Sequence, residues 1–109
     1  MNKELLIKMY TAILKCLSIS EKINNIEDLK NNIAYDILLS NLILIRDIES
    51  KIPEKTKNKL HCIDWSMFQD YDNQMNNKLV FNDYEIIYKI LKKVLPKLQI
   101  NLENIIFSQ

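Results

Sequence analysis

The chain has 109 residues, the size of one domain built around a single modest core. Hydrophobic residues make up 48% and charged residues 27% of the sequence, values that exclude an intrinsically disordered chain. The formal net charge of +1 excludes the strong positive field of an obligate nucleic-acid binder, so we expect any contact with RNA to be local. Glycine is absent, which disfavours β-hairpins because their tight turns need it, and we therefore expect an all-α fold.

The first half of the sequence has helical periodicity. Apolar residues at three- and four-residue steps over residues 5–23 predict a long first helix, which Asn24 and Asn25 end. A short amphipathic turn over residues 26–29 leads to a second long helix over residues 33–50. Its middle is apolar on nearly every side, so we expect it to be the central helix of the bundle or to face a second subunit as well.

Shorter helices follow in the middle of the chain. Pro53 suits the first position of a short third helix ending at Leu60, which lysines at positions 51, 55, 57 and 59 make basic. Asp64 is a natural N-cap for a fourth helix, because its carboxylate can accept hydrogen bonds from the first turn. Trp65, Phe68 and Tyr71 then share one face of that helix.

The last helix has clear start and interruption signals. Asn82 or Asp83 can cap its first turn, and the apolar positions that follow have a strong helical period. Pro96 removes a backbone donor and should bend or restart the helix. A final segment over residues 97–107 closes the fold. We thus predict one domain over residues 1–109, an antiparallel bundle of four to five helices.

The sequence shows no sign of export or of membrane insertion. Residues 1–4 lead directly into the first amphipathic pattern, without the charged and apolar regions of a secretory leader. The longest apolar run, residues 42–45, is far shorter than the ~18 residues that span a bilayer. We therefore expect a cytoplasmic protein without membrane contact, in which Cys16 and Cys62 stay reduced.

The spacing of several residues around positions 63–88 carries a family resemblance. Two anchor groups fix a register without gaps: Ile63 and Trp65 fall on an Ile-Pro-Trp motif, and Asp83, Glu85 and Ile86 fall on an Asp-Leu-Glu-Ile motif. Both motifs belong to the HepT-like branch of the HEPN ribonucleases, which the chain resembles. The resemblance implies a HEPN-type helical bundle that forms a homodimer.

The resemblance extends to both sides of this window. Residues 36–48 look like the family's Asp-Ala-Val-Leu-Arg-Asn-Leu-Glu-Ile-Ile-Gly-Glu-Ala helix, and residues 90–98 are similar to its Ile-Ile-Lys-Glu-Asp-Leu-Pro-Glu-Leu. Residues 33–106 are covered, whereas the first helix matches only in its apolar pattern. For an intact member of this family, the resemblance implies metal-independent cleavage of RNA. The reaction would take place in a cleft between two subunits and need no cofactor.

The family's catalytic motif, Arg-x4-His-x-Tyr, falls on residues of different chemistry here. In the fixed register its three positions are Asp72, Asn77 and Leu79. Asp72 would repel the phosphate that an arginine holds, and Asn77 cannot exchange a proton near neutral pH, a loss that typically costs ~10² to 10⁴ in rate. Leu79 replaces the tyrosine that the resemblance implies a partner nucleotidyltransferase would adenylylate.

The same window is strongly acidic. Between residues 63 and 88, four aspartates and one glutamate oppose Lys78 alone, which favours a basic partner over RNA. Three interpretations stay open: a solvated helix end, a cleft reused for binding, and catalysis by another arrangement. We expect the lining of the former cleft to consist of five residues: Asp72, Asn73, Asn76, Asn77 and Leu79.

Three other groups of side chains have both a functional and a structural interpretation. Tyr71 and Tyr84 offer hydroxyls, but tyrosines at helical spacing usually belong to a core or an interface. His61 and Cys62 with Cys16 give only three potential metal ligands, fewer than a structural zinc site uses, so no metal is expected. A lysine stripe on the last helix could meet phosphate or simply be solvated: Lys89, Lys93 and Lys97.

These observations predict a function and two alternatives. The first hypothesis is the HEPN component of a bacterial toxin–antitoxin type module, a non-catalytic homodimer whose partner is a minimal nucleotidyltransferase. The second is an active ribonuclease toxin with a rearranged site. The third is a helical adaptor subunit of a larger nucleic-acid or defence complex.

Overall fold

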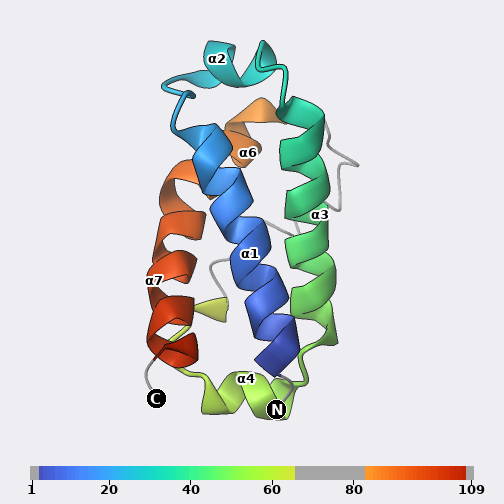
Figure 1. Ribbon diagram of the computed structural model, residues 1–109, viewed down its shortest axis with the longest axis vertical. Helices are drawn as coiled ribbons and strands as arrows, with labels where there is room; N and C mark the ends of the chain where they lie inside the picture. The colour runs from blue at the N-terminus through green and yellow to red at the C-terminus, as the bar shows by residue number, and fades with distance from the viewer. Residues whose placement is uncertain (1–2, 66–82, 108–109) are drawn as a thin grey trace.

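The computed structural model describes residues 3–65 and 83–107 of the chain, and every element in this part is helical. The elements in chain order are α1 (Lys3–Ser20), α2 (Ile26–Lys30), α3 (Tyr35–Lys51), α4 (Glu54–Lys59), α6 (Tyr84–Lys89), the π-helix η1 (Ile90–Val94) and α7 (Leu95–Ile106) (Figure 1). The predicted all-α bundle is therefore confirmed for the described residues.

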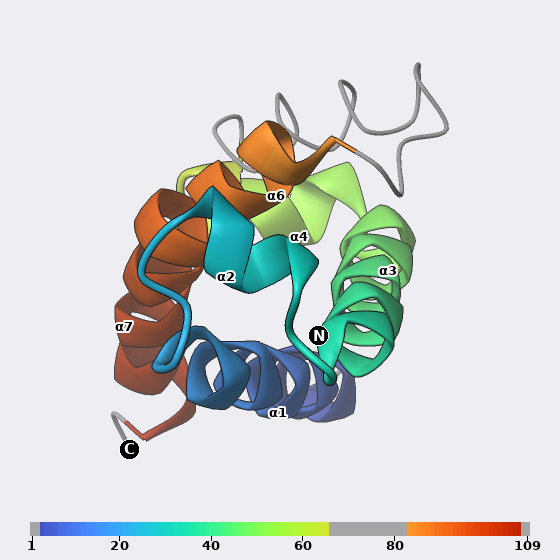
Figure 2. The ribbon, with the colours of Figure 1, turned by 90° about the horizontal axis from the view of Figure 1, so that it is seen from above.

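Three long helices form the body of the bundle. α1 runs antiparallel to both α3 and α7 and packs against each of them, while α4 crosses the end where α1 begins (Figure 1). Seen from above, α3 and α7 lie on opposite sides of α1, and α2 covers the other end with α6 (Figure 2). Among the described elements α1 is the central helix, so the first of the two alternatives for residues 33–50, a central helix, is wrong for this part of the chain.

The apolar face of α3 is only partly covered. Its inward side chains reach the core, but Ile37 and Leu44 on its outer side are exposed. Within the described residues the extensive helix contact of α3 is with α1. The broad apolar pattern of α3 thus reflects one buried face plus exposed apolar residues, and the alternative that this helix faces a second subunit stays a prediction.

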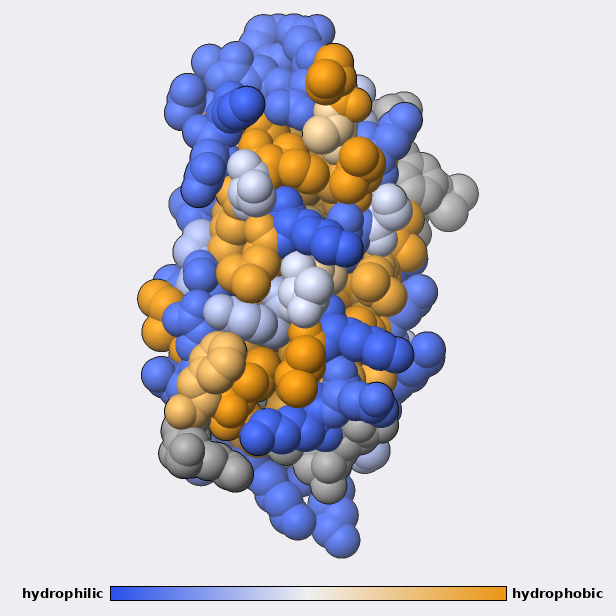
Figure 3. Space-filling view, viewed as in Figure 1, coloured by the Kyte–Doolittle hydropathy of each residue, from blue (hydrophilic) through white to orange (hydrophobic). Residues whose placement is uncertain are grey.

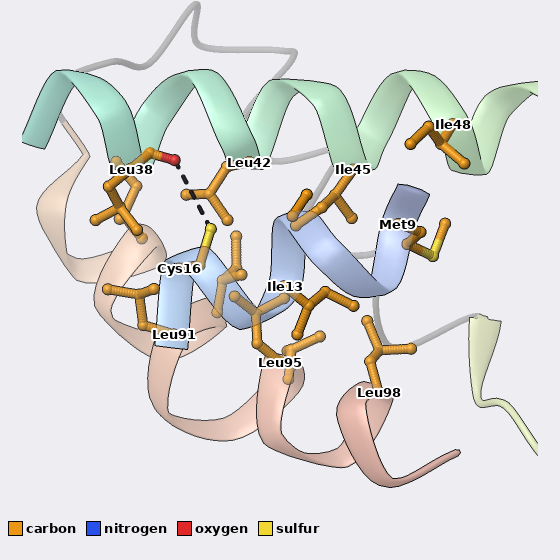
Figure 4. Close-up of a cluster of buried hydrophobic side chains, with 14 of the residues drawn as sticks. Met9, Ile13, Cys16, Leu38, Leu42, Ile45, Ile48, Leu91, Leu95 and Leu98 are labelled. Atoms are coloured by element: carbon orange, nitrogen blue, oxygen red, sulfur yellow. Dashed lines mark hydrogen bonds between the residues drawn. The ribbon is translucent and has the colours of Figure 1, made fainter. Parts of the chain in front are cut away.

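The core lies between α1, α3 and the helix formed by η1 and α7. Figure 4 shows Ile13 and Cys16 of α1 between Leu38 of α3 and Leu91 of η1, all fully buried. The thiol of Cys16 donates a hydrogen bond to the carbonyl oxygen of Leu38, with an S···O distance of 3.9 Å. Each fully buried aliphatic side chain contributes about 1.5–3 kcal/mol, so this layer supplies much of the driving force for folding.

The first helix is shorter than predicted. α1 ends at Ser20, whose carbonyl accepts two hydrogen bonds, from the N–H of Ile23 at 2.9 Å and from the ammonium of Lys92 at 2.8 Å. Asn25 begins α2 instead, since its side-chain oxygen accepts from the N–H of Asp28 at 2.8 Å. Asn24 and Asn25 therefore separate two helices, as their preference for caps and turns favours.

The long helix at the C-terminal side contains one widened turn. Each four-residue step advances an α-helix by about 40°, so side chains four apart soon leave one face. Five buried residues nevertheless follow this spacing: Ile86, Ile90, Val94, Leu98 and Leu102. The π-helix η1 keeps them on one side, and the N–H of Leu95 donates to the carbonyl of Ile90, five residues back.

Pro96 explains where the widened turn lies. Because proline has no N–H, the carbonyl of Lys92 loses the donor it would have in a regular α-helix. The π-helix ends at Val94, and α7 restarts at Leu95 with Pro96 in its first turn. The predicted interruption at Pro96 is confirmed, and it takes the form of a wider turn before the proline.

Two predicted helix starts are found in the described residues. Pro53 is the N-cap of α4, whereas it was expected at the first helical position, one residue further on. Asp83 is the N-cap of α6, where its carboxylate oxygen Oδ1 accepts from the N–H of Ile86 at 3.1 Å. Asn82, the other predicted cap, lies outside the described residues.

We expect an Asp83→Ala substitution to lower the free energy of unfolding by about 1 kcal/mol, because the first turn of α6 loses its side-chain acceptor. Asp83→Asn is the matched control: the amide oxygen can still accept from Ile86, so most of the stability should be kept. Urea unfolding followed by circular dichroism measures both. Equal stability of the alanine variant and the natural protein would contradict the capping role.

Candidate functional site

The residues predicted to line the former cleft fall in the part of the chain that the structure does not describe. Residues 66–82 contain all five of them, Asp72, Asn73, Asn76, Asn77 and Leu79, together with Phe68 and Tyr71 of the predicted fourth helix. The structure does describe both ends of the window, residues 63–65 and 83–88. These ends fix where the segment leaves the bundle and where it returns.

The first end is held by a buried ion pair. The ammonium of Lys57 on α4 lies 2.8 Å from the carboxylate oxygen Oε1 of Glu49 on α3, and both side chains are buried. The same ammonium lies 5.5 Å from the ring centroid of Trp65, a distance typical of a cation–π contact. Ile63, which lies between Lys57 and Trp65 in the sequence, is buried in the core. These contacts join α3 and α4 to the start of the window.

Trp65 is held mainly by packing. Its ring is half-buried against the core. Its indole Nε1 is buried and donates to no acceptor in the described structure. Leaving a buried donor unpaired costs about 1–3 kcal/mol, so the apolar contacts and the cation of Lys57 must outweigh that cost.

The sequence interpretation missed this ion pair. Lys57 was counted among the lysines that make the short third helix basic, but its side chain is buried and its charge is balanced by Glu49, whereas Lys51, Lys55 and Lys59 are exposed. A signal was present, since Glu49 follows Ile45 by four residues and so lies on the inward stripe of α3. A buried carboxylate requires a partner, and a lysine eight residues later supplies it.

The second end is held by aromatic contacts. The ring of Tyr84 lies 5.4 Å from that of Tyr35, and the ammonium of Lys30 lies 5.5 Å from the Tyr84 ring centroid. Burial, with smaller contributions from Tyr84 and Asp36, raises the pKa of Tyr35 to about 12, so this phenol stays protonated near neutral pH. Tyr84 packs against the core, which confirms the structural interpretation of this tyrosine.

The described ends of the window are acidic. Asp64 and Glu85 are exposed and Asp83 is half-buried, while Lys57 is balanced by Glu49 and Lys30 lies over the ring of Tyr84. A phosphate would meet repulsion here, and a basic group would be attracted. The geometry at both ends anchors the chain, and the residues named do not form an acid–base pair.

The other candidate groups are separated or solvated. Cys16 is buried in the core, whereas His61 and Cys62 are exposed. Over residues 3–65 and 83–107 no three potential metal ligands among His, Cys, Asp and Glu lie together. Three lysines of the last helix are all exposed, which fits either a phosphate contact or a solvated face: Lys89, Lys93 and Lys97.

Two further findings do not depend on the geometry of a site. Of the helices described, none combines the length and the apolar character needed to cross a bilayer. Comparison with protein-family models, with curated proteins and with solved structures gives no match to this chain.

Proposed function

We propose that the protein is the HepT-like HEPN component of a bacterial HEPN/nucleotidyltransferase toxin–antitoxin type module, and that it binds without cleaving RNA. One observation carries this proposal: Asp72 and Asn77 stand at the positions of the family's catalytic arginine and histidine. A carboxylate cannot hold a phosphate, and an amide cannot serve as a general acid or base. The protein is thus a binding subunit in a cytoplasmic complex with a minimal nucleotidyltransferase.

The environment of the anchor residues supports the family register. Ile63 and Trp65 at the first end and Ile86 at the second end are all buried in or packed against the same core. Residues that determine where a cleft segment leaves and re-enters a bundle must be fixed in this way if its frame is retained. The acidic side chains at both ends favour a basic partner surface over the RNA backbone.

A homodimer through the long helices is part of the proposal. Ile37 and Leu44 lie seven residues apart on the outer side of α3 and are exposed. That spacing aligns them along one stripe, so a second copy could cover both at once. In the resembling family the two clefts face each other, and a dimer on this side would bring two acidic windows into one assembly.

Restoring the family's motif tests the proposal directly. Purified natural protein and the variant Asp72→Arg, Asn77→His, Leu79→Tyr are incubated with RNA in a chelator, so that metal-dependent contaminants are silent. We expect the natural protein to be inactive and the restored variant to cut. The matched control, Asp72→Lys, Asn77→Gln, Leu79→Phe, has similar charge and bulk but no group that titrates near pH 7, and a restored His-dependent activity should be lower in it by ~10² or more.

Two outcomes would overturn this proposal. Cleavage by the natural protein would show an active ribonuclease with a rearranged site. Inactivity of all three folded proteins would mean that the register, and with it the family resemblance, is wrong. Expression in bacteria without the partner provides a further check, because a non-catalytic subunit should leave growth unaffected when soluble protein accumulates.

A further inference from the structure

Four exposed hydrophobic side chains lie on α1 and on the C-terminal helix. Ile7 and Leu14 of α1 are 44% and 38% exposed, and Ile100 and Phe107 at α7 are 57% and 66% exposed. Ile7 and Leu14 are seven residues apart, so they lie on one stripe of α1, two turns from each other. Such residues are individually common on a surface, but here they lie on two helices that pack against each other.

Direct contacts join the two helices at the middle of this face. The hydroxyl of Tyr10 on α1 donates a 2.7 Å hydrogen bond to the carboxylate of Glu103 on α7, and its ring meets that of Phe107 edge-on, with centroids 5.8 Å apart. An open hollow between them is lined by four residues: Tyr10, Glu103, Asn104 and Phe107. We call the surface formed by Ile7, Tyr10, Leu14, Ile100 and Phe107 the α1–α7 face.

Hydrophobic and hydrophilic residues alternate on this side of the molecule. In Figure 3, which views α1 from the front, hydrophobic areas lie along the helix and beside it, separated by strongly hydrophilic side chains. Lys8 and Lys15 directly follow Ile7 and Leu14 and are exposed. Because consecutive residues point about 100° apart around a helix, these two lysines lie on the flank of the apolar stripe of α1 and not on the stripe itself.

The helices that carry the α1–α7 face are net positive. α1 carries three lysines and one carboxylate, and η1 with α7 also carries three lysines and one carboxylate, Glu103. The whole chain has a net charge of only +1, so the remaining residues are net negative. Glu103 is engaged by Tyr10 and by the amide Nε2 of Gln99 at 3.1 Å, while Lys93 and Lys97 are exposed.

This charge distribution selects the occupant. A second copy placed on the same face would set lysines against lysines, which disfavours self-association. A helix with apolar side chains three, four and seven residues apart and acidic residues on both flanks would cover the apolar stripe and pair with the lysines. We propose that the α1–α7 face binds an acidic amphipathic helix of a partner protein.

The proposal stands apart from the window at residues 63–88. It uses none of the motif positions, and it concerns a different surface from the exposed apolar residues of α3. Its charge preference is also opposite, since the window favours a basic partner and the α1–α7 face an acidic one. Variants of one surface therefore leave the other intact, and the two proposals can fail independently.

Two designed peptides of about 20 residues test the proposal, with the same leucines at helical spacing and either glutamate or lysine on the flanks. Binding of each fluorescently labelled peptide to the full-length protein is measured by anisotropy. We expect the acidic peptide to bind at least about 10-fold more tightly than the basic one, with a preference that weakens as salt is added.

Matched variants locate the binding surface. Leu14→Ser with Ile100→Ser should weaken binding of the acidic peptide about 10-fold or more, whereas Ile33→Ser, at an exposed apolar side chain between α2 and α3, should leave it unchanged. Lys8→Glu with Lys15→Glu should reverse the preference between the two peptides. Circular dichroism confirms that each variant is folded, which is expected because all the substituted side chains are exposed.

Three results would overturn the proposal. Equal affinity for both peptides, or no binding of either, would remove the acidic helix as occupant. Loss of binding in Ile33→Ser would place the surface elsewhere. Sedimentation equilibrium gives the third: conversion of a dimer to a monomer by Leu14→Ser with Ile100→Ser would show that a second copy covers the α1–α7 face.

Discussion

An alanine at position 49 is expected to lower the free energy of unfolding by about 3–5 kcal/mol. Glu49 and Lys57 are both buried, and their charged atoms lie 2.8 Å apart. Removing the carboxylate leaves an ammonium in an apolar environment with no balancing charge, which is among the largest effects of a single substitution. The loss should be global, because the pair joins α3 to α4 and to Trp65.

Two further variants separate the ion pair from general effects of substitution. Asp47→Ala removes an exposed carboxylate two residues away on the same helix and should change stability by no more than about 0.5 kcal/mol. Glu49→Leu with Lys57→Met replaces both charges by apolar groups and should recover most of the loss, since a buried pair is worth little more than good packing. Urea unfolding followed by circular dichroism measures all three. A double variant as unstable as Glu49→Ala would contradict the unpaired-charge explanation.

The second large effect is a loss of stability in alkaline solution. Burial raises the pKa of the Cys16 thiol from 9.0 to about 12. In the unfolded chain the thiol ionises first, so between these two values the unfolded state binds fewer protons than the folded state. The contribution of the protonated Cys16 thiol to the free energy of unfolding is therefore fully present below about pH 9. It is lost as pH rises towards about 12, by up to about 1.4 kcal/mol per pH unit.

The difference between two cysteine variants isolates this contribution. Cys16→Ala should be less stable than the natural protein at pH 7, because it leaves a cavity in the core, but its stability should fall less steeply above pH 9. Cys62→Ala removes an exposed thiol and should keep the steep decline. Tyr10 and Tyr35 also have a raised pKa, yet they are present in every variant and cancel in the comparison. Parallel stability curves for Cys16→Ala and the natural protein would contradict the prediction.

Local signals in the sequence predicted most of the helices but not their arrangement. Asp83 and Pro96 act through the backbone next to them, so their effects on helix start and interruption could be inferred from residue type alone. Which helix lies in the centre depends on packing between distant segments, and the apolar pattern of α3 was misleading because Ile37 and Leu44 are exposed. The hydrogen bond from Lys92 to the carbonyl of Ser20 at the end of α1 is likewise a long-range contact, since the two residues are 72 positions apart in the sequence.

For the candidate site, the sequence predicts which residues belong to it but not how they are arranged in space. The register that assigns Asp72 and Asn77 to the family's motif comes from anchor residues, and the structure describes those anchors and not the motif. The inward direction of Lys57 could not be read from its basic neighbours, because charge alone does not distinguish a solvated lysine from one paired with a buried carboxylate. The α1–α7 face, in turn, required knowing which two helices are adjacent.

The place of Trp65 makes the natural protein its own optical probe. The chain contains a single tryptophan, and its ring lies beside Lys57 at the last described residue before the predicted cleft segment. Indole emission from the folded protein therefore originates at this one junction, with no label or substitution required. A partner that docks at the window would change the polarity around this ring, whereas a helix bound on the α1–α7 face would leave the emission maximum in place, so one spectrum can tell the two surfaces apart.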